Sequence, residues 1–172
     1  MTHKGLPLSA SLANQRENLV RKWFDGIAQA YPESTSRFLA REKDPFQNPI
    51  GHTLKENLSV LFDKIIQPKE PASLTTELND IVRMRAVQDF SAGQAVSFPF
   101  LLKKILREEC TADVSRHPEE FADLEARIDE MALLAFDLFM KSRERLYEIK
   151  YNEAKRSVFM LEKTRQNGNP RQ

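Results

Sequence analysis

The chain has few residues that could form disulfides or metal sites. Among its 172 residues there is one cysteine, Cys110, so no intrachain disulfide can form, and the three histidines lie far apart. Metal sites built from Cys and His need several such residues at short, regular spacing. The composition therefore predicts a protein without a metal site, and the single cysteine favours a reducing, cytoplasmic location.

Long hydrophobic runs are also missing. The longest apolar-dominated segment, residues 131–140, is interrupted by Asp137, whereas a bilayer span needs roughly 18 uninterrupted apolar residues. The first residues contain no apolar segment of the length that a secretory signal requires. We therefore expect no membrane span and no secretory leader.

The common catalytic motifs are absent too. Only five glycines occur, and they form neither a phosphate-binding loop nor the Gly-x-Ser-x-Gly turn of serine hydrolases. No His-Glu-x-x-His spacing is present. The sequence therefore predicts a protein that is not an enzyme and that uses no cofactor.

The net charge of +1 conceals an uneven distribution. Lys plus Arg total 26 and Asp plus Glu total 25, but the segment from Lys141 onward has nine basic and four acidic residues. That segment is therefore +5, and the first 140 residues are −4. We expect an acidic helical body over residues 1–140 and a basic C-terminal helix extension with a frayed tail over residues 141–172.

Helical periodicity dominates the rest of the pattern. Apolar residues recur three and four positions apart, which is typical of amphipathic helices, and strand-like alternation is nearly absent. We predict an all-α bundle of about six helices, at residues 11–31, 34–41, 50–66, 74–88, 92–109 and 118–165. Ser91 is the expected N-cap of the fifth helix, and Pro99 should kink that helix.

The last predicted helix is too long for the body. A continuous helix over residues 118–165 would measure about 72 Å, whereas a globule of this chain length is only about 40 Å across. Its second half would leave its apolar residues unprotected unless they pair with a second copy. This half therefore either pairs with a second copy or frays. We favour a parallel homodimer formed through this helix, with Leu146, Ile149, Phe159 and Met160 as its contact residues, and antiparallel pairing is the alternative.

One polar segment, residues 80–91, stands out from the solvated helix faces. Within it Arg83 and Arg85 are close to Asp89, and Arg85 falls on the inner stripe of the predicted helix. A buried arginine needs an acceptor, and the candidates are Asp89 and Asp137. Alternatively, Arg85 reaches solvent and Asp137 lies on an exposed edge.

A second polar segment, residues 43–52, contains two prolines and a glycine, which indicates a rigid loop. His52 closes this loop at the start of a predicted helix. Structural capping is the role we expect for it, and titration near neutral pH is the alternative.

Short segments in a fixed order resemble the N-terminal domain of the RsbT co-antagonist RsbRD family. They are Arg-Phe-Leu (37–39), Lys-Asp-Pro-Phe (43–46), Asn-Pro (48–49), Gly-His-Thr (51–53), Ile-Val-Arg (81–83), Arg-Ala-Val-Gln-Asp-Phe-Ser (85–91) and Leu-Ala-Phe-Asp (134–137), with residues 147–156. The resemblance covers about residues 12–156. It implies a globin-related, haem-free sensory or regulatory module that dimerises and passes a signal down its last helix to a STAS output domain.

The sequence differs from that pattern because it ends at Gln172, which leaves no room for a STAS domain. We therefore expect a stand-alone module that acts on a separate regulatory protein. Haem finds no support, because the region where a globin places its iron ligand contains no histidine. A haem-free pocket lined by Trp23, Phe98 and Phe136 could hold an apolar or anionic ligand, although aromatic residues at this spacing are also typical of core.

The basic tail suggests one further alternative, a nucleic-acid-binding helix. Three acidic residues, Glu144, Glu148 and Glu153, interrupt its basic face and would repel a phosphate backbone. We therefore expect a protein partner rather than a nucleic acid.

Overall fold

The computed structural model describes residues 6–41, 46–67, 74–88 and 90–167, and all secondary structure in these ranges is helical, as predicted. The helices are α1 (Leu8–Asn14), α2 (Arg16–Ala28), α3 (Glu33–Arg41), α4 (Pro49–Ile65), α5 (Thr75–Ala86), α6 (Ala92–Ala95), α7 (Phe98–Glu109), α8 (Thr111–Arg116) and α9 (Pro118–Asn167). Within the described part of the chain, no helix is long and apolar enough to cross a membrane.

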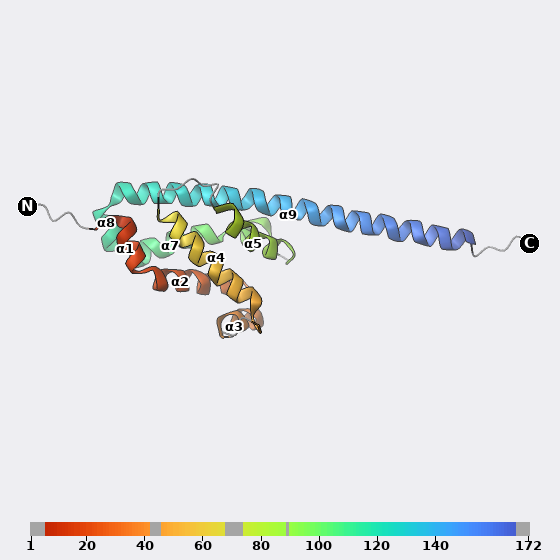
Figure 1. Ribbon diagram of the computed structural model, residues 1–172, viewed down its shortest axis with the longest axis horizontal. Coiled ribbons are helices and arrows are strands. Elements are labelled where there is room, and N and C mark those ends of the chain that lie inside the picture. Colours follow the sequence, from red (N-terminus) through yellow and green to blue (C-terminus); the bar gives the residue numbers. More distant parts are fainter. Residues whose placement is uncertain (1–5, 42–45, 68–73, 89, 168–172) are drawn as a thin grey trace, which may run out of the picture.

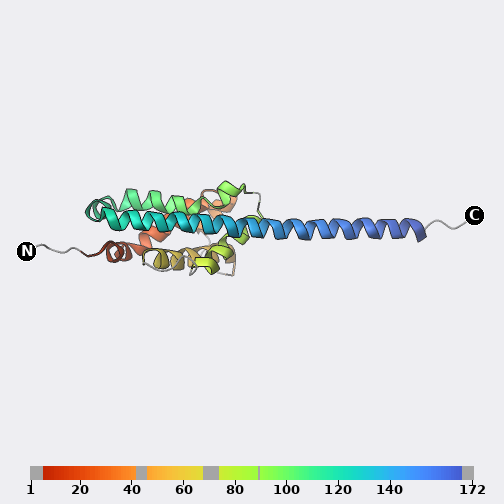
Figure 2. The same ribbon diagram turned by 90° about the horizontal axis from the view of Figure 1, so that it is seen from above.

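Helix α9 is the longest element, and its first half forms one side of the body (Figures 1 and 2). Helices α5 and α7 pack against it. Helix α2 packs against α4 and α7, and α4 also packs against α5. The core lies between these layers. Its largest fully buried apolar side chains include Trp23, Phe62 and Phe98.

The packed side of α9 ends well before the helix does. The helix has 50 residues and is therefore about 75 Å long, but Phe139 is its last buried residue and Leu146 the last that packs against the core. Every residue from 147 to 163 is exposed. Residues 147–167, here called the projecting segment, extend beyond the body as a single helix (Figure 1).

The predicted first helix is divided in two at Gln15. This residue has φ −102° and ψ 6°, which ends α1 and begins α2. Its amide Nε2 donates to Asp113 Oδ2 of α8 at 3.1 Å. The contact joins residues distant in sequence, so the apolar periodicity alone could not reveal it.

The predicted fifth helix is broken rather than kinked. Pro99 has no N–H to donate to the Ala95 carbonyl, and in a continuous helix its ring would collide with that carbonyl. In the structure, α6 ends at Ala95 and α7 begins at Phe98, which places Pro99 in the first turn, where no donor is needed. The prediction of Ser91 as an N-cap is confirmed, because Ser91 and Gln94 form a reciprocal capping box.

The sequence pattern missed the short helix α8, which has no buried side chain and hence no apolar stripe. The other predicted helices agree with α3, α4, α5 and α9 to within two residues at each end.

Candidate functional site

Arg85 lies in the core, near the C-terminal end of α5. Its side chain is 1% exposed, which confirms the predicted burial. The Nη1 atom donates to the carbonyl oxygens of Gln94 and Ala95 at 3.0 and 3.2 Å. Arg85 therefore binds the C-terminal end of α6.

Pro99 explains why carbonyl groups are available to accept hydrogen bonds from Arg85. A continuous helix would pair the Ala95 carbonyl with the N–H of residue 99, and proline has none. The break therefore leaves carbonyls at the end of α6 without helical donors, and a buried carbonyl without a donor is costly. The guanidinium donates to both carbonyls, of which that of Gln94 also accepts from Ser97 Oγ at 3.0 Å. Its positive charge suits the negative end of a helix.

Three aromatic rings surround the Arg85 guanidinium. Its central carbon lies 5.7 Å from the ring centre of Tyr31, 5.1 Å from that of Phe90 and 5.7 Å from that of Phe98, within the range of cation–π attraction. Burial lowers the pKa of Arg85, and the nearby Tyr31 hydroxyl opposes that shift. We call Arg85, the three rings and the two carbonyl groups the Arg85 cluster.

Asp137, one of the two candidate partners of Arg85, does not pair with it, and its exposure agrees with the alternative. Asp137 is exposed on α9, and among the described residues no carboxylate forms an ion pair with Arg85. The alternative partner, Asp89, lies outside the described residues. Arg83, the other arginine of this segment, is exposed.

A second arginine joins α5 to α9. Arg143 Nη1 donates to the carbonyl oxygen of Ala86, the last residue of α5, at 3.0 Å. Its Nη2 donates to the Tyr147 hydroxyl, also at 3.0 Å, and the guanidinium carbon lies 5.2 Å from the centre of that ring. Tyr147 is the first residue of the projecting segment. The end of α5 is thus held by Arg85 to α6 on one side and by Arg143 to α9 on the other.

The capping role expected for His52 belongs to Asn48. The buried Asn48 side chain accepts from the Gly51 N–H at 2.9 Å and donates to the Leu39 carbonyl at 3.3 Å. A Cβ on Gly51 would lie only 2.3 Å from the Asn48 amide nitrogen, so glycine is needed there. His52 is exposed, and its Nε2 lies 3.1 Å from Glu56 Oε1 on the same helix.

The predicted aromatic pocket is not formed by its three residues. Trp23 and Phe98 are buried side by side, and Trp23 Nε1 donates to the Phe98 carbonyl at 2.7 Å. Phe136 is 43% exposed on α9. Trp23 and Phe98 are therefore core residues, while Phe136 belongs to the surface.

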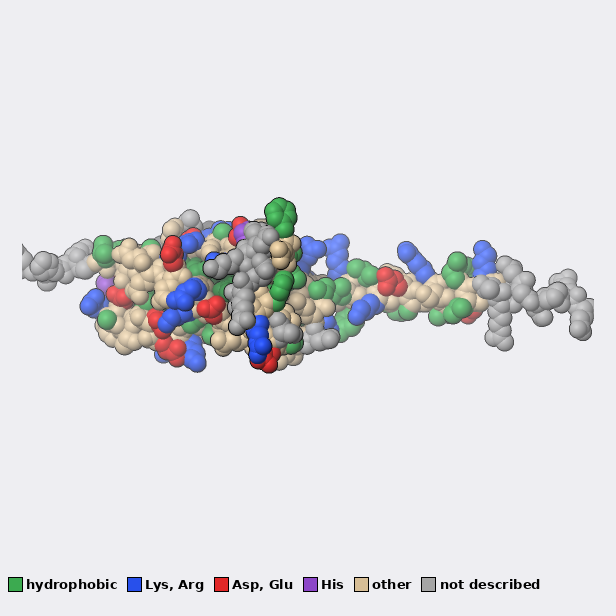
Figure 3. Space-filling view, turned by 90° about the horizontal axis from the view of Figure 1, so that it is seen from below, with side chains coloured by type: hydrophobic (Ala, Val, Ile, Leu, Met, Phe, Trp, Pro, Cys, Tyr) green, Lys and Arg blue, Asp and Glu red, His purple; other side chains and the backbone are tan. Residues whose placement is uncertain are grey.

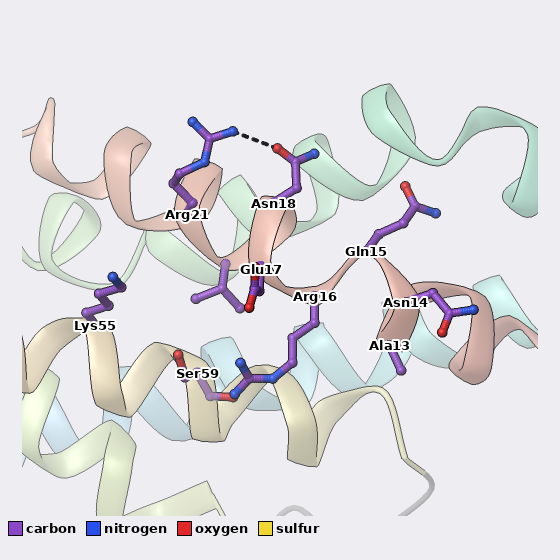
Figure 4. A pocket seen from close by; sticks show the side chains of 10 residues that line it. Ala13, Asn14, Gln15, Arg16, Glu17, Asn18, Arg21, Lys55 and Ser59 are labelled. Carbon is purple, nitrogen blue, oxygen red and sulfur yellow. Dashed lines mark hydrogen bonds between the residues drawn. The ribbon is translucent and has the colours of Figure 1, made fainter.

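A groove of about 1010 Å³ lies at the α1–α2 break, facing α4 (Figure 4). Its Arg16 binds both oxygens of Asp63, at 2.6 and 2.8 Å, and these hydrogen bonds raise the pKa of Arg16. Arg21 donates to Asn18 at 2.8 Å. These polar groups are occupied by partners within the protein, so the groove is a weak candidate for a ligand site.

The outer side of α9 has a row of exposed apolar residues, interrupted between Met140 and Tyr147, where the half-buried Arg143 lies on the same side. At 100° per residue, eight residues fall within an arc of about 80°. They are Leu133, Phe136, Met140, Tyr147, Tyr151, Ala154, Val158 and Leu161, here called the apolar stripe, and all are exposed. The stripe begins on the body and continues along the projecting segment, with the spacing of three, four and seven that helix pairing requires.

The predicted contact residues lie elsewhere on α9. Leu146 is half-buried against the core, and Ile149 and Met160 continue the same side of the helix beyond the body. Phe159 is exposed and lies about 100° round the helix from its neighbour Val158. The seven-residue spacing of Leu133, Met140, Tyr147, Ala154 and Leu161 was the sequence signal that could have identified the stripe.

The family model for the RsbT co-antagonist protein rsbRD N-terminal domain matches residues 17–153. This range includes the Arg85 cluster, Arg143 and the first part of the projecting segment, and it confirms the resemblance drawn from the sequence. No curated protein and no solved structure matches the chain. Since the matched range covers most of its residues, the chain belongs to the RsbT co-antagonist protein rsbRD N-terminal domain family.

Proposed function

We propose that this protein is a non-enzymatic regulatory or sensory module that forms a parallel homodimer through α9 and passes a signal along that helix to a separate protein. Membership of the RsbRD N-terminal domain family supports a regulatory role in a stressosome-type system. The observation that carries the proposal is the apolar stripe, which continues from the body to the projecting segment.

Dimerisation removes the stripe from water. A monomer would expose a row of large apolar side chains that extends about 42 Å along the helix, and surfaces of this kind mark interaction sites in soluble proteins. Pairing two stripes in parallel places identical residues opposite one another, as in a two-stranded coiled coil. It also directs both C-terminal ends the same way, as signalling down the last helix requires.

The two arginines provide a route from the body to the paired helices. Arg85 holds α5 to the α6–α7 break, and Arg143 holds the end of α5 to α9 beside Tyr147 of the stripe. A shift of α6 or α7 would therefore move the end of α5 and, with it, the start of the projecting segment. Discrete packed contacts of this kind are the physical means by which two sites become coupled.

Two neighbouring residues of α9 test the proposal. Val158 lies on the stripe and is 55% exposed, while Phe159 lies off it and is 62% exposed. At micromolar concentration, sedimentation of the unchanged chain should give about twice the 19.9 kDa chain mass. Val158→Glu should weaken association at least about tenfold, because the carboxylate would be buried between two helices.

Phe159→Glu serves as the matched control, because it introduces the same charge one residue away on another side of the helix. We expect it to leave association nearly unchanged. A monomeric unchanged chain, or equal effects of the two substitutions, would contradict the proposal.

A further inference from the structure

A cleft of about 460 Å³ lies where α9 leaves the body, between the end of α5 and residues 141–149 of α9. Three cations line it: Arg83 from α5, and Lys141 and Arg145 from α9. No carboxylate is among its lining residues. Lys and Arg side chains are visible in this region in Figure 3. The cleft is therefore a local concentration of positive charge on a nearly neutral protein.

These cations differ from several others of the body. Ion pairs between helices neutralise other basic side chains, as in Lys64–Glu77, Lys103–Asp129 and Arg107–Glu125. Within the described ranges, Arg83, Lys141 and Arg145 have no hydrogen bond or ion pair. Asp137 and Glu148 lie one helical turn from Lys141 and Arg145 on α9 but form no ion pair with them among the described residues, so the cleft keeps an excess of positive charge.

The positive surface continues along the projecting segment. At 100° per residue, Lys141, Arg145, Arg156 and Lys163 fall within an arc of about 60°, on the side of α9 that lies away from the apolar stripe. All four are exposed. We call them the basic face. A partner on this face and a second copy on the stripe would therefore not compete.

The rest of the cleft wall includes apolar groups. Val87, Leu146 and Ile149 lie beside the cations, and Val87 and Ile149 are exposed. Such a wall suits side chains such as Leu or Phe, and Asn79 and Ser142 add two polar groups to it. The basic face also has a gap of eleven residues between Arg145 and Arg156, about 16 Å, whereas duplex DNA presents a charge about every 1.7 Å.

We propose that the cleft and the basic face bind an acidic segment of a partner protein that carries apolar side chains among its carboxylates. A small anion is a poor match, because the cleft is open and exposed cations attract single charges weakly in water. A segment with several carboxylates engages several cations at once, and its apolar side chains contact the cleft wall. The segment would bridge α5 and α9 beside the Arg143 contact with Ala86.

This inference rests on the proposed function only in taking the partner to be a protein, and it does not require the homodimer. The probe is a short peptide that alternates pairs of glutamate with leucine. Its binding to the isotope-labelled full chain would be followed by NMR. We expect the largest shifts at the end of α5 and at residues 141–149, with binding that weakens as salt is raised.

Two triple variants with the same change in charge locate the site. Changing Arg83, Lys141 and Arg145 to Gln should weaken peptide binding at least about tenfold. The matched control changes Arg21, Lys55 and Lys104 to Gln, all exposed and outside the cleft, and should have little effect. A peptide with Gln in place of Glu should not bind.

The inference is overturned if the peptide does not bind, if both triple variants weaken binding equally, or if the chain prefers a short DNA duplex to the peptide. Sedimentation of the same samples reports the homodimer separately. Loss of the dimer with retained peptide binding contradicts the proposed function alone, and a dimer that does not bind the peptide contradicts this inference alone.

Discussion

The body and the projecting segment use the same residue types in opposite ways. In the body, apolar side chains are enclosed between helix layers, and even a buried arginine has acceptors from a broken helix. In the projecting segment, Tyr151, Val158 and Leu161 are exposed although their spacing is that of a packed helix. The comparison teaches that the body encloses its apolar side chains, although the buried Arg85 Nε has no hydrogen-bond partner, while the projecting segment leaves a similar apolar pattern exposed.

The Arg85 cluster provides the largest test of the body. Arg85→Ala should lower the free energy of unfolding by about 3 kcal/mol, because it leaves a cavity and removes the donor of the buried Ala95 carbonyl. Chemical denaturation measures the change. Arg85→Met is the control, because it fills the space without the donor and should recover part of the loss. An unchanged midpoint for Arg85→Ala would show that the cluster does not stabilise the body.

The contact between body and projecting segment should have a smaller effect. Arg143→Ala removes the hydrogen bonds to Ala86 and Tyr147 and should cost about 1 kcal/mol, because both are partly exposed. Hydrogen exchange should rise at the end of α5 and around Tyr147 and remain unchanged in α2 and α4. Tyr147→Phe, which removes only the hydroxyl, should give a weaker version of the same result. Uniform changes throughout the chain would contradict a local contact.

Cys110 gives the smallest expected effect and tests whether solvent reaches the core at the end of α7. The thiol is 2% exposed, and burial, with smaller contributions from Asp113 and Glu109, raises its pKa from 9.0 to about 11. The thiol of the unfolded chain has the lower pKa and loses its proton first. The contribution of the protonated Cys110 thiol to the free energy of unfolding is therefore complete below pH 9.0 and disappears as the pH rises to about 11.

Between pH 9 and pH 10, denaturation should therefore show a loss that is about 1 kcal/mol greater in the unchanged chain than in a Cys110→Ala variant. Thiol reagents should also react slowly with the folded protein. Fast labelling of the Cys110 thiol, or identical pH curves for the two chains, would show that solvent reaches this residue in the folded protein.

The sequence predicted the features that depend on local pattern. The all-α class, the bounds of α3, α4, α5 and α9 and the Ser91 cap follow from periodicity and capping chemistry. The burial of Arg85 followed from its place on the inner stripe. The excess length of the last helix followed from its continuous pattern and the absence of a breaker.

The features that depend on contacts between distant residues were not predictable. The break at Gln15 is accompanied by a contact with Asp113, and Arg85 binds two carbonyls, of which Pro99 leaves that of Ala95 without a helical donor. A side chain that binds backbone atoms leaves no pairing signal in the sequence, so a carboxylate was expected in their place. The position of Phe136 was misjudged because apolar character alone does not distinguish a buried residue from an exposed one.

The most direct test of the central claim, parallel pairing along the apolar stripe, is a disulfide between two copies. Ala154 lies on the stripe, whereas Asn152 lies on another side of α9, and both are exposed. In a parallel pair, two copies of Ala154→Cys approach closely enough for a disulfide, which needs Cα atoms about 4.4–6.8 Å apart. We predict that mild oxidation cross-links Ala154→Cys almost completely and leaves Asn152→Cys largely monomeric on non-reducing gels. Equal cross-linking of both variants, or none of Ala154→Cys, would contradict parallel pairing through the stripe.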